Sequence, residues 1–139
     1  MNILDTLRIS ASGLTSQRIR LQAISSNLAN ARSTRTEEGG PYQRRMLVFQ
    51  AVPVDYFGDE LEKQLSRVEV IDIEKSEAPG KLVYDPNHPD ANEQGYVEYP
   101  NVEMLHEMVD MMTPSRSYES NTIAVMTTYR MANAALELG

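Results

Sequence analysis

The chain has 139 residues, a formal net charge of −7, a sequence pI near 4.8 and no cysteine. Its acidic balance argues against a nucleic-acid-binding protein, because phosphate recognition uses clustered Lys and Arg. Without cysteine it has no disulfides, thiol nucleophiles or cysteine-bound metals. No apolar run approaches the ~20 residues that span a bilayer, so we expect no membrane insertion. The first residues also lack the basic and apolar regions of a cleaved signal peptide.

The N-terminal stretch, residues 2–32, is predicted to be a helix. Leucines recur at heptad spacing, which places them on one helical face. The predicted seam contains Leu7, Leu14, Leu21, Ile24 and Leu28. Ile9 and Ile19 project from a second face, which we expect to contact neighbouring molecules.

A longer helical pattern occupies residues 101–139, where apolar or small residues alternate at four-residue and three-residue spacing. Asn101 is the expected N-cap. Pro114 predicts a kink, or a restart capped by Thr113, without a change of direction. The seam is expected to pack on the N-terminal helix, and to contain Met104, Met108, Met111, Tyr118, Val125, Tyr129 and Leu136. Its methionines are interpreted as core filler rather than as an adaptable contact surface.

Between the helices the pattern changes to that of strands. We predict strands over residues 46–54, 67–74, 81–84 and 94–99, where alternation or β-branched residues predominate. The predicted fold class is therefore α+β, with terminal helices packed as an antiparallel coiled coil and a small antiparallel β domain inserted between them. The predicted boundaries are 1–35, 36–100 and 101–139.

No catalytic site or cofactor site is predicted. The loop of residues 84–95 offers Asp85, His88 and Asp90, but Asp90 stands where a calcium loop needs glycine. We interpret the loop as a rigid turn, because Pro, Asn and Asp favour turns. His106 has Glu103 and Asp110 nearby, which is a weak metal-ligand set on a charged helix surface.

Charge is unevenly distributed along the chain. Residues 1–45 hold seven basic and three acidic residues, and residues 46–139 hold six basic and seventeen acidic residues. The net charge is therefore +4 for residues 1–45 and −11 for residues 46–139. Such a polarised chain is suited to pairing its basic end with the acidic part of a neighbour, although a solvated surface is an equal alternative.

Five segments resemble the flagellar rod and hook axial protein family. SGLTSQRIRLQAISSNLANA (12–31) is similar to the N-terminal signature of that family. The later segments resemble its proximal-rod members: TEEGGPYQRR (36–45), DPNHPDANEQGYV (85–97), PNVEMLHEMVDMM (100–112) and SRSYESN (115–121). The motif positions are Asn27, Asn30, Gly39, Gly40, Pro41, Tyr42, Asp85, Pro86, Asp90, Gly95 and Tyr96. Pro114 departs from the family pattern, where a small helix former is more usual.

The resemblance implies a structural subunit of the bacterial flagellar basal body, located in the periplasmic space and exported without a cleaved signal. The implied partners are copies of itself, other rod proteins, the distal rod protein, the MS-ring and hook-basal-body adaptor at the rod base, and the flagellar type III export apparatus. Two alternatives remain on the residues alone: a cytoplasmic helical binding module, such as an export chaperone, and a metal-dependent hydrolase using the His88 loop.

Overall fold

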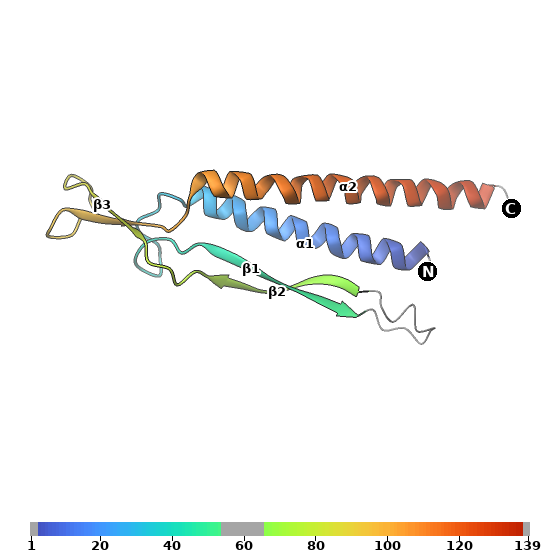
Figure 1. The fold of residues 1–139 in the computed structure, drawn as a ribbon, viewed down its shortest axis with the longest axis horizontal. Coiled ribbons are helices and arrows are strands. Elements are labelled where there is room, and N and C mark those ends of the chain that lie inside the picture. Colours follow the sequence, from blue (N-terminus) through green and yellow to red (C-terminus); the bar gives the residue numbers. More distant parts are fainter. Residues whose placement is uncertain (1–2, 54–65, 138–139) are drawn as a thin grey trace.

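Two long antiparallel helices dominate the computed structural model, which describes residues 3–53 and 66–137. Helix α1 spans Ile3–Ala29 and helix α2 spans Met104–Glu137. They lie side by side, with the first residue of α1 and the last residue of α2 at the same end of an elongated molecule (Figure 1). The predicted α+β fold, with a long helix at each end of the chain, is confirmed.

Helix α2 begins later than the sequence predicted and is not interrupted. Because its first residue is Met104, Glu103 and not Asn101 occupies the position just before the helix. The backbone N–H of Glu107 donates to the carbonyl of Glu103 at 3.0 Å, which closes the first turn. The helix continues through the buried Pro114, so the second of the two predicted alternatives, a restart capped by Thr113, is wrong, and Figure 1 shows one continuous rod.

The four strands of the described residues form two separate two-stranded antiparallel sheets. Strand β1 (Arg45–Pro53) pairs with β2 (Ser66–Lys75), and β3 (Lys81–Tyr84) pairs with β4 (Tyr96–Tyr99). The register of β1 and β2 shifts by one residue because Val48 pairs with Asp72 whereas Phe49 pairs with Val70. Ile71 is therefore the extra residue of a β-bulge, which increases local twist. The predicted end of the first strand, at Val54, lies outside the described residues.

The first hairpin lies along α1, on the side away from α2 (Figure 1). Helix α1 is thus the middle layer of three. The hydroxyl of Ser16 donates to the carbonyl of Val68 at 3.1 Å, and the N–H of Val68 donates to the hydroxyl of Ser12 at 3.4 Å. This arrangement gives α1 contacts on two sides, so Ile9 and Ile19, which we expected to face neighbours, are half-buried within the chain.

The second hairpin, β3–β4, forms a knob beyond the helix pair, at the end away from the termini (Figure 1). A small apolar cluster of Ala31, Tyr42 and Val102 lies where the chain leaves α1 and enters α2. Few other apolar residues are buried in the described part of the chain, and they include Ala23, Ile24 and Val97. The single chain therefore leaves much of its apolar surface uncovered.

Candidate assembly interface

The polar residues that suggested a metal site are used in turns. In the loop of residues 85–95, between β3 and β4, Asp85 accepts a hydrogen bond from the N–H of Asn87 at 3.3 Å. His88 Nδ1 accepts one from the N–H of Asp90 at 3.1 Å. The Asp90 carboxylate accepts from Thr34 Oγ1 at 2.8 Å and lies 3.9 Å from Arg35. Within residues 3–53 and 66–137, no group of three His, Cys, Asp or Glu side chains is placed to hold a metal ion.

The two acidic residues near His106 contact different partners. Its Nδ1 lies 2.8 Å from the Glu103 carboxylate, whereas Asp110 lies 3.6 Å from the guanidinium of Arg44. The Glu103–His106 contact spans one helical turn on an exposed surface. These positions stabilise the start of α2 rather than converge on a site.

Asn27, near the C-terminal end of α1, is the centre of a buried polar junction. Its side chain is only 1% exposed and makes four hydrogen bonds. The amide nitrogen donates to the Arg45 carbonyl at 3.0 Å and to Glu107 Oε2 at 3.1 Å. The amide oxygen accepts from the Tyr42 hydroxyl and from the Arg45 N–H, each at 2.9 Å. One side chain thus joins α1, the connector of residues 30–44, β1 and α2, with all four of its hydrogen-bonding positions used.

Glu107 brings a charge into this junction. It is 1% exposed, and its Oε1 accepts from Arg44 Nε at 2.5 Å. Removing a carboxylate from water is costly unless a partner and hydrogen bonds compensate for the lost hydration. Arg44 and Asn27 provide both, so the start of α2 is held in one position relative to the end of α1.

The connector between α1 and β1 is shaped by the motif residues that lie within it. Asn30 Nδ2 donates to the Ser26 carbonyl at 2.9 Å, and the Ser33 hydroxyl donates to Asn30 Oδ1 at 3.1 Å. Gly39 and Gly40 have φ angles of 87° and 74°, which disfavour side chains with a Cβ. The turn ends at Pro41 and directs Tyr42 into the junction, where its hydroxyl meets Asn27.

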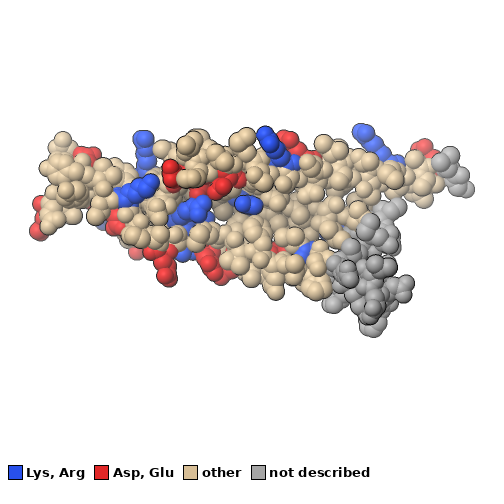
Figure 2. Space-filling view, viewed as in Figure 1, with Lys and Arg blue, Asp and Glu red and all other residues tan. Residues whose placement is uncertain are grey.

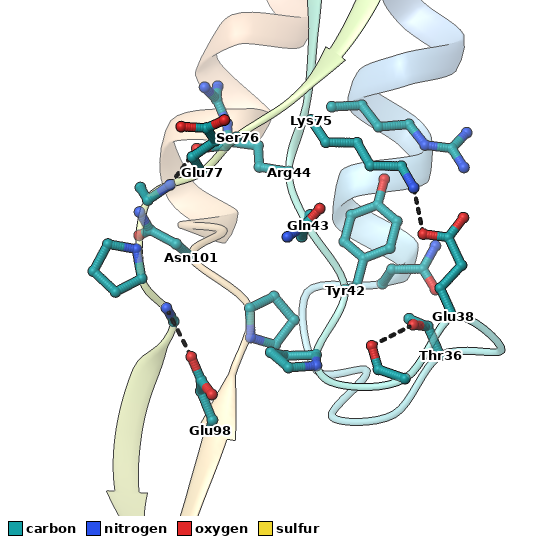
Figure 3. Close-up of a pocket in the computed structure, with 18 of the residues that line it drawn as sticks. Thr36, Glu38, Tyr42, Gln43, Arg44, Lys75, Ser76, Glu77, Glu98 and Asn101 are labelled. Atoms are coloured by element: carbon teal, nitrogen blue, oxygen red, sulfur yellow. Dashed lines mark hydrogen bonds and ion pairs between the residues drawn. The ribbon is translucent and has the colours of Figure 1, made fainter.

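A polar cleft of about 660 Å³ opens beside the junction. Figure 3 shows Glu38 and Lys75 on one side of it, and Glu98 and Asn101 on the other. Lys75 forms an ion pair with Glu38, and the hydrogen bond from Lys75 lowers the pKa of the Glu38 carboxyl. The cleft therefore lies between the connector and the start of the knob, and its walls carry charges of both signs.

The predicted seam on α1 lies inside the molecule. Ile24 is buried, and the four heptad leucines are half-buried: Leu7, Leu14, Leu21 and Leu28. Gly13 marks the close approach of the helices, because a Cβ there would lie 3.1 Å from the Asn121 amide nitrogen. Together with the Asn27–Glu107 contact, this proximity sets the register of the antiparallel pair.

The apolar seam predicted on α2 is only partly turned toward α1. Met111 and Val125 are half-buried, whereas Tyr129 and Leu136 are 63% and 80% exposed. Tyr129 and Leu136 therefore do not pack on α1 as expected within one chain. Met104, Met108 and Tyr118 are also exposed. The covered face of α2 is instead mainly polar or small, and contains Glu107, Met111, Pro114, Ser115, Asn121, Val125, Thr128 and Ala132.

A stripe of large apolar side chains on α2 consequently faces solvent. Leu105, Met108, Val109 and Met112 have the spacing i, i+3, i+4 and i+7, which places them on one helical face, and each is more than half exposed. Ile123 and Met126 are 65% and 56% exposed farther along the helix. A stripe of this kind marks a surface for protein contact.

Sequence reasoning missed the residues that hold the fold together by polar contacts. Glu107 and Arg44 were noted only within family segments, and Arg44 also as one of several basic residues. Ser12 and Ser16, four residues apart on α1, anchor β2 through its backbone. No local pattern distinguishes such a serine or glutamate from an exposed one, because its partner lies far away in the sequence.

No helix in the described part of the chain combines the length and apolar character needed to cross a membrane. Two family models match the chain. One, described as flagella basal body rod protein, matches residues 7–34, and the other, described as flagellar basal body rod FlgEFG protein C-terminal, matches residues 93–138.

Curated relatives are similar over their whole length. The flagellar basal-body rod protein FlgC of Aquifex aeolicus is 45% identical, covering 99% of this chain and 97% of the relative. The FlgC protein of Bacillus subtilis is 42% identical, covering 100% and 99%. That of Borreliella burgdorferi is 39% identical, covering 99% and 98%.

Proposed function

This chain belongs to the FlgC family of flagellar basal-body rod proteins, the structural subunits of the proximal rod, and from that premise we propose how it assembles. Its two terminal helices pack against helices of neighbouring subunits in a head-to-tail, helical arrangement. The helices form the wall of a tube that surrounds the export channel and transmits torque. The β3–β4 knob and the β1–β2 hairpin lie outside that wall.

The exposed apolar stripe of α2 is the observation that carries this proposal. Met108 and Met112 are 57% and 53% exposed in the single chain, although methionine usually lies inside proteins. Burial of such surface contributes about 25 cal/mol per Å². Contacts between two different patches of identical subunits extend into open helical assemblies. The chain thus has the surface expected of a subunit whose core is completed by its neighbours.

The partners and location are further parts of the proposal. Neighbours along the rod are copies of this chain, other rod proteins and the distal rod protein. The MS ring and the hook-basal-body adaptor lie at the base. The chain reaches the periplasmic space through the flagellar type III export apparatus without a cleaved signal peptide, and it has no catalytic role.

Motility in a strain lacking the native gene tests the assembly function. A Met108→Lys substitution places a charge in the exposed stripe, and the expected result is loss of swimming and of rods in isolated basal bodies. The matched control is Gln50→Lys, which adds the same charge at an exposed position on β1 and should preserve both. Swimming cells with normal rods in the Met108→Lys strain would contradict the proposal.

Hydrogen exchange distinguishes the proposal of a rod subunit from the alternative of a helical binding module or export chaperone. In a rod subunit, amides of residues 3–29 and 104–137 should exchange faster in the dilute monomer than in isolated basal bodies. A self-contained module should protect these amides equally in both samples, because its core needs no neighbours.

A further inference from the structure

The β3–β4 knob has one open face and one partly covered face, on which Val83 is still 45% exposed. Register places Leu82 opposite Glu98 and Tyr84 opposite Tyr96, so these four side chains share a face. Val97, on the other face, is only 1% exposed. On the open face, Leu82 is 68% exposed, Tyr84 64% and Tyr96 42%. Large apolar side chains of a two-stranded sheet are thus left exposed in the described part of the chain.

The open face is ordered rather than loose. The Tyr84 and Tyr96 rings meet edge to face, with centroids 5.3 Å apart. Gly95 lies against the Tyr84 ring, because a Cβ at Gly95 would be 2.9 Å from Tyr84 Cε2. Leu82, Tyr96 and Glu98 also line a groove of about 410 Å³ that extends to the connector. An aromatic surface held in this way loses little entropy when it binds.

The charge of the knob indicates which kind of partner its open face binds. Residues 81–99 hold Lys81 and four carboxylates, a net charge of −3. Acidic side chains gather over the knob and the adjoining part of β2, at the left and lower left of Figure 2. Arg35 already pairs with Asp90, whereas Glu98 lies in the groove wall with only the Gly80 N–H as a partner among the described residues. A basic partner with exposed Arg side chains fits both the carboxylate and the tyrosine rings.

The chain itself carries such a surface on α1. Residues 6–32 contain four Arg and no carboxylate. The outward face of α1 has the helical spacing of three and four, and its members are all exposed: Arg8, Ala11, Thr15, Arg18, Gln22, Ser25 and Ala29. Arg8 and Arg18 form no ion pair with a described carboxylate. The outward stripe of α2 fits less well, because Arg116 and Glu119 follow its apolar residues and cancel in charge.

We propose that the open face of the knob, formed by Leu82, Tyr84, Tyr96 and Glu98, binds the outward face of α1 of a second copy of this chain. Arg18 of the second copy lies over the tyrosine rings and pairs with Glu98. Small neighbours on the same helix face, Ala11 and Thr15, leave room for Leu82. The contact joins two different patches, so it repeats from copy to copy. This inference rests on the proposed rod function and specifies one contact within it.

Cysteine cross-linking tests the contact directly, because the chain has no cysteine of its own. A chain with Thr15→Cys and Leu82→Cys replaces the native protein in flagellated cells, and basal bodies are oxidised. The expected result is a ladder of dimers, trimers and larger species. Either single variant gives at most a dimer. The double variant Leu82→Cys/Thr127→Cys, with its second thiol exposed on α2, should give no ladder.

Charge reversal then identifies the pair. In the Thr15→Cys/Leu82→Cys background, Arg18→Glu or Glu98→Arg should abolish the ladder, and the two reversals together should restore it. A motile strain without a ladder overturns the inference but leaves the rod function standing. If the Thr15→Cys/Leu82→Cys strain is not motile, the test is repeated with Ala11→Cys/Tyr84→Cys. Absence of a ladder in that second strain also overturns the inference. Loss of rods in the Met108→Lys strain is independent of this contact and tests the rod function alone.

Discussion

The amide nitrogen of Asn27 lies 3.1 Å from a carboxylate oxygen of Glu107, so the end of α1 is joined to the start of α2 by two buried side chains. They are eighty positions apart in the sequence. Because both are only 1% exposed, neither can exchange this contact for water without moving a helix. The contact therefore determines where the two helices begin to run side by side.

Replacing Asn27 by alanine should strongly destabilise the junction. The substitution removes an acceptor from the Tyr42 hydroxyl and the Arg45 N–H, and a donor from Glu107. Unsatisfied buried polar groups cost about 1–3 kcal/mol each, and we expect a loss of about 3 kcal/mol in the free energy of unfolding. Urea denaturation followed by circular dichroism measures it. Asn133→Ala, at an exposed position of α2, is the control and should change little.

Arg44 and Glu107 should be energetically coupled. Glu107→Leu leaves Arg44 with only the more distant Asp110, and Arg44→Met leaves a buried carboxylate with Asn27 alone. The double substitution is expected to lower the free energy of unfolding by less than the sum of the two single substitutions. The difference, which is the interaction free energy, should be about 1–3 kcal/mol. Urea denaturation of the four proteins completes the cycle. Strictly additive losses would show that the pair contributes nothing beyond its separate members.

The pKa of Glu38 should depend on Lys75. The hydrogen bond and charge of Lys75 lower the pKa of the Glu38 carboxyl from its ordinary value of 4.5. A lowered pKa in the folded state gives stability that is present above the unfolded pKa and lost as pH falls through the folded pKa. In Lys75→Gln, the Glu38 pKa should rise toward the ordinary value, as measured by NMR titration of the side-chain carboxyl. An unchanged pKa would show that the pair does not persist in solution.

The sequence was sufficient to predict both helices from their helical spacing, and the four strands of the described residues mainly from alternation or β-branched residues. Leu7, Leu14, Leu21 and Leu28 identify α1 by spacing alone, and the β-branched run of residues 67–74 identifies β2. The covered face of α2 was not predictable in this way. Its apolar residues follow one stripe, but α1 contacts the adjacent one, where Glu107, Pro114 and Asn121 lie.

The mismatch between the apolar stripe of α2 and the face that α1 contacts has a physical cause. Hydrophobic periodicity reports every surface that is buried in the functional assembly, whereas a single chain shows only the surfaces buried within itself. Met108 and Tyr129 conform to the period but remain exposed, and their role in an interface stays a prediction. Long-range partners such as Ser16 and Val68, fifty-two positions apart, leave no periodic signal.

A Gly95→Ala substitution should disturb the knob more than a comparable change elsewhere. Gly95 has a φ angle of 80°, and a Cβ there would lie 2.9 Å from the Tyr84 ring. Gly39→Ala is the matched control, because Gly39 has a φ angle of 87° but no atom within 4 Å of its Cβ position. Both changes should cost about 1 kcal/mol through the backbone. Only Gly95→Ala should also displace Tyr84, which is seen as changed ring-proton shifts of Tyr84 and Tyr96 in NMR spectra. Equal ring shifts in both variants would contradict the packing of Tyr84 on Gly95, and with it the ordered aromatic face on which the contact between copies depends.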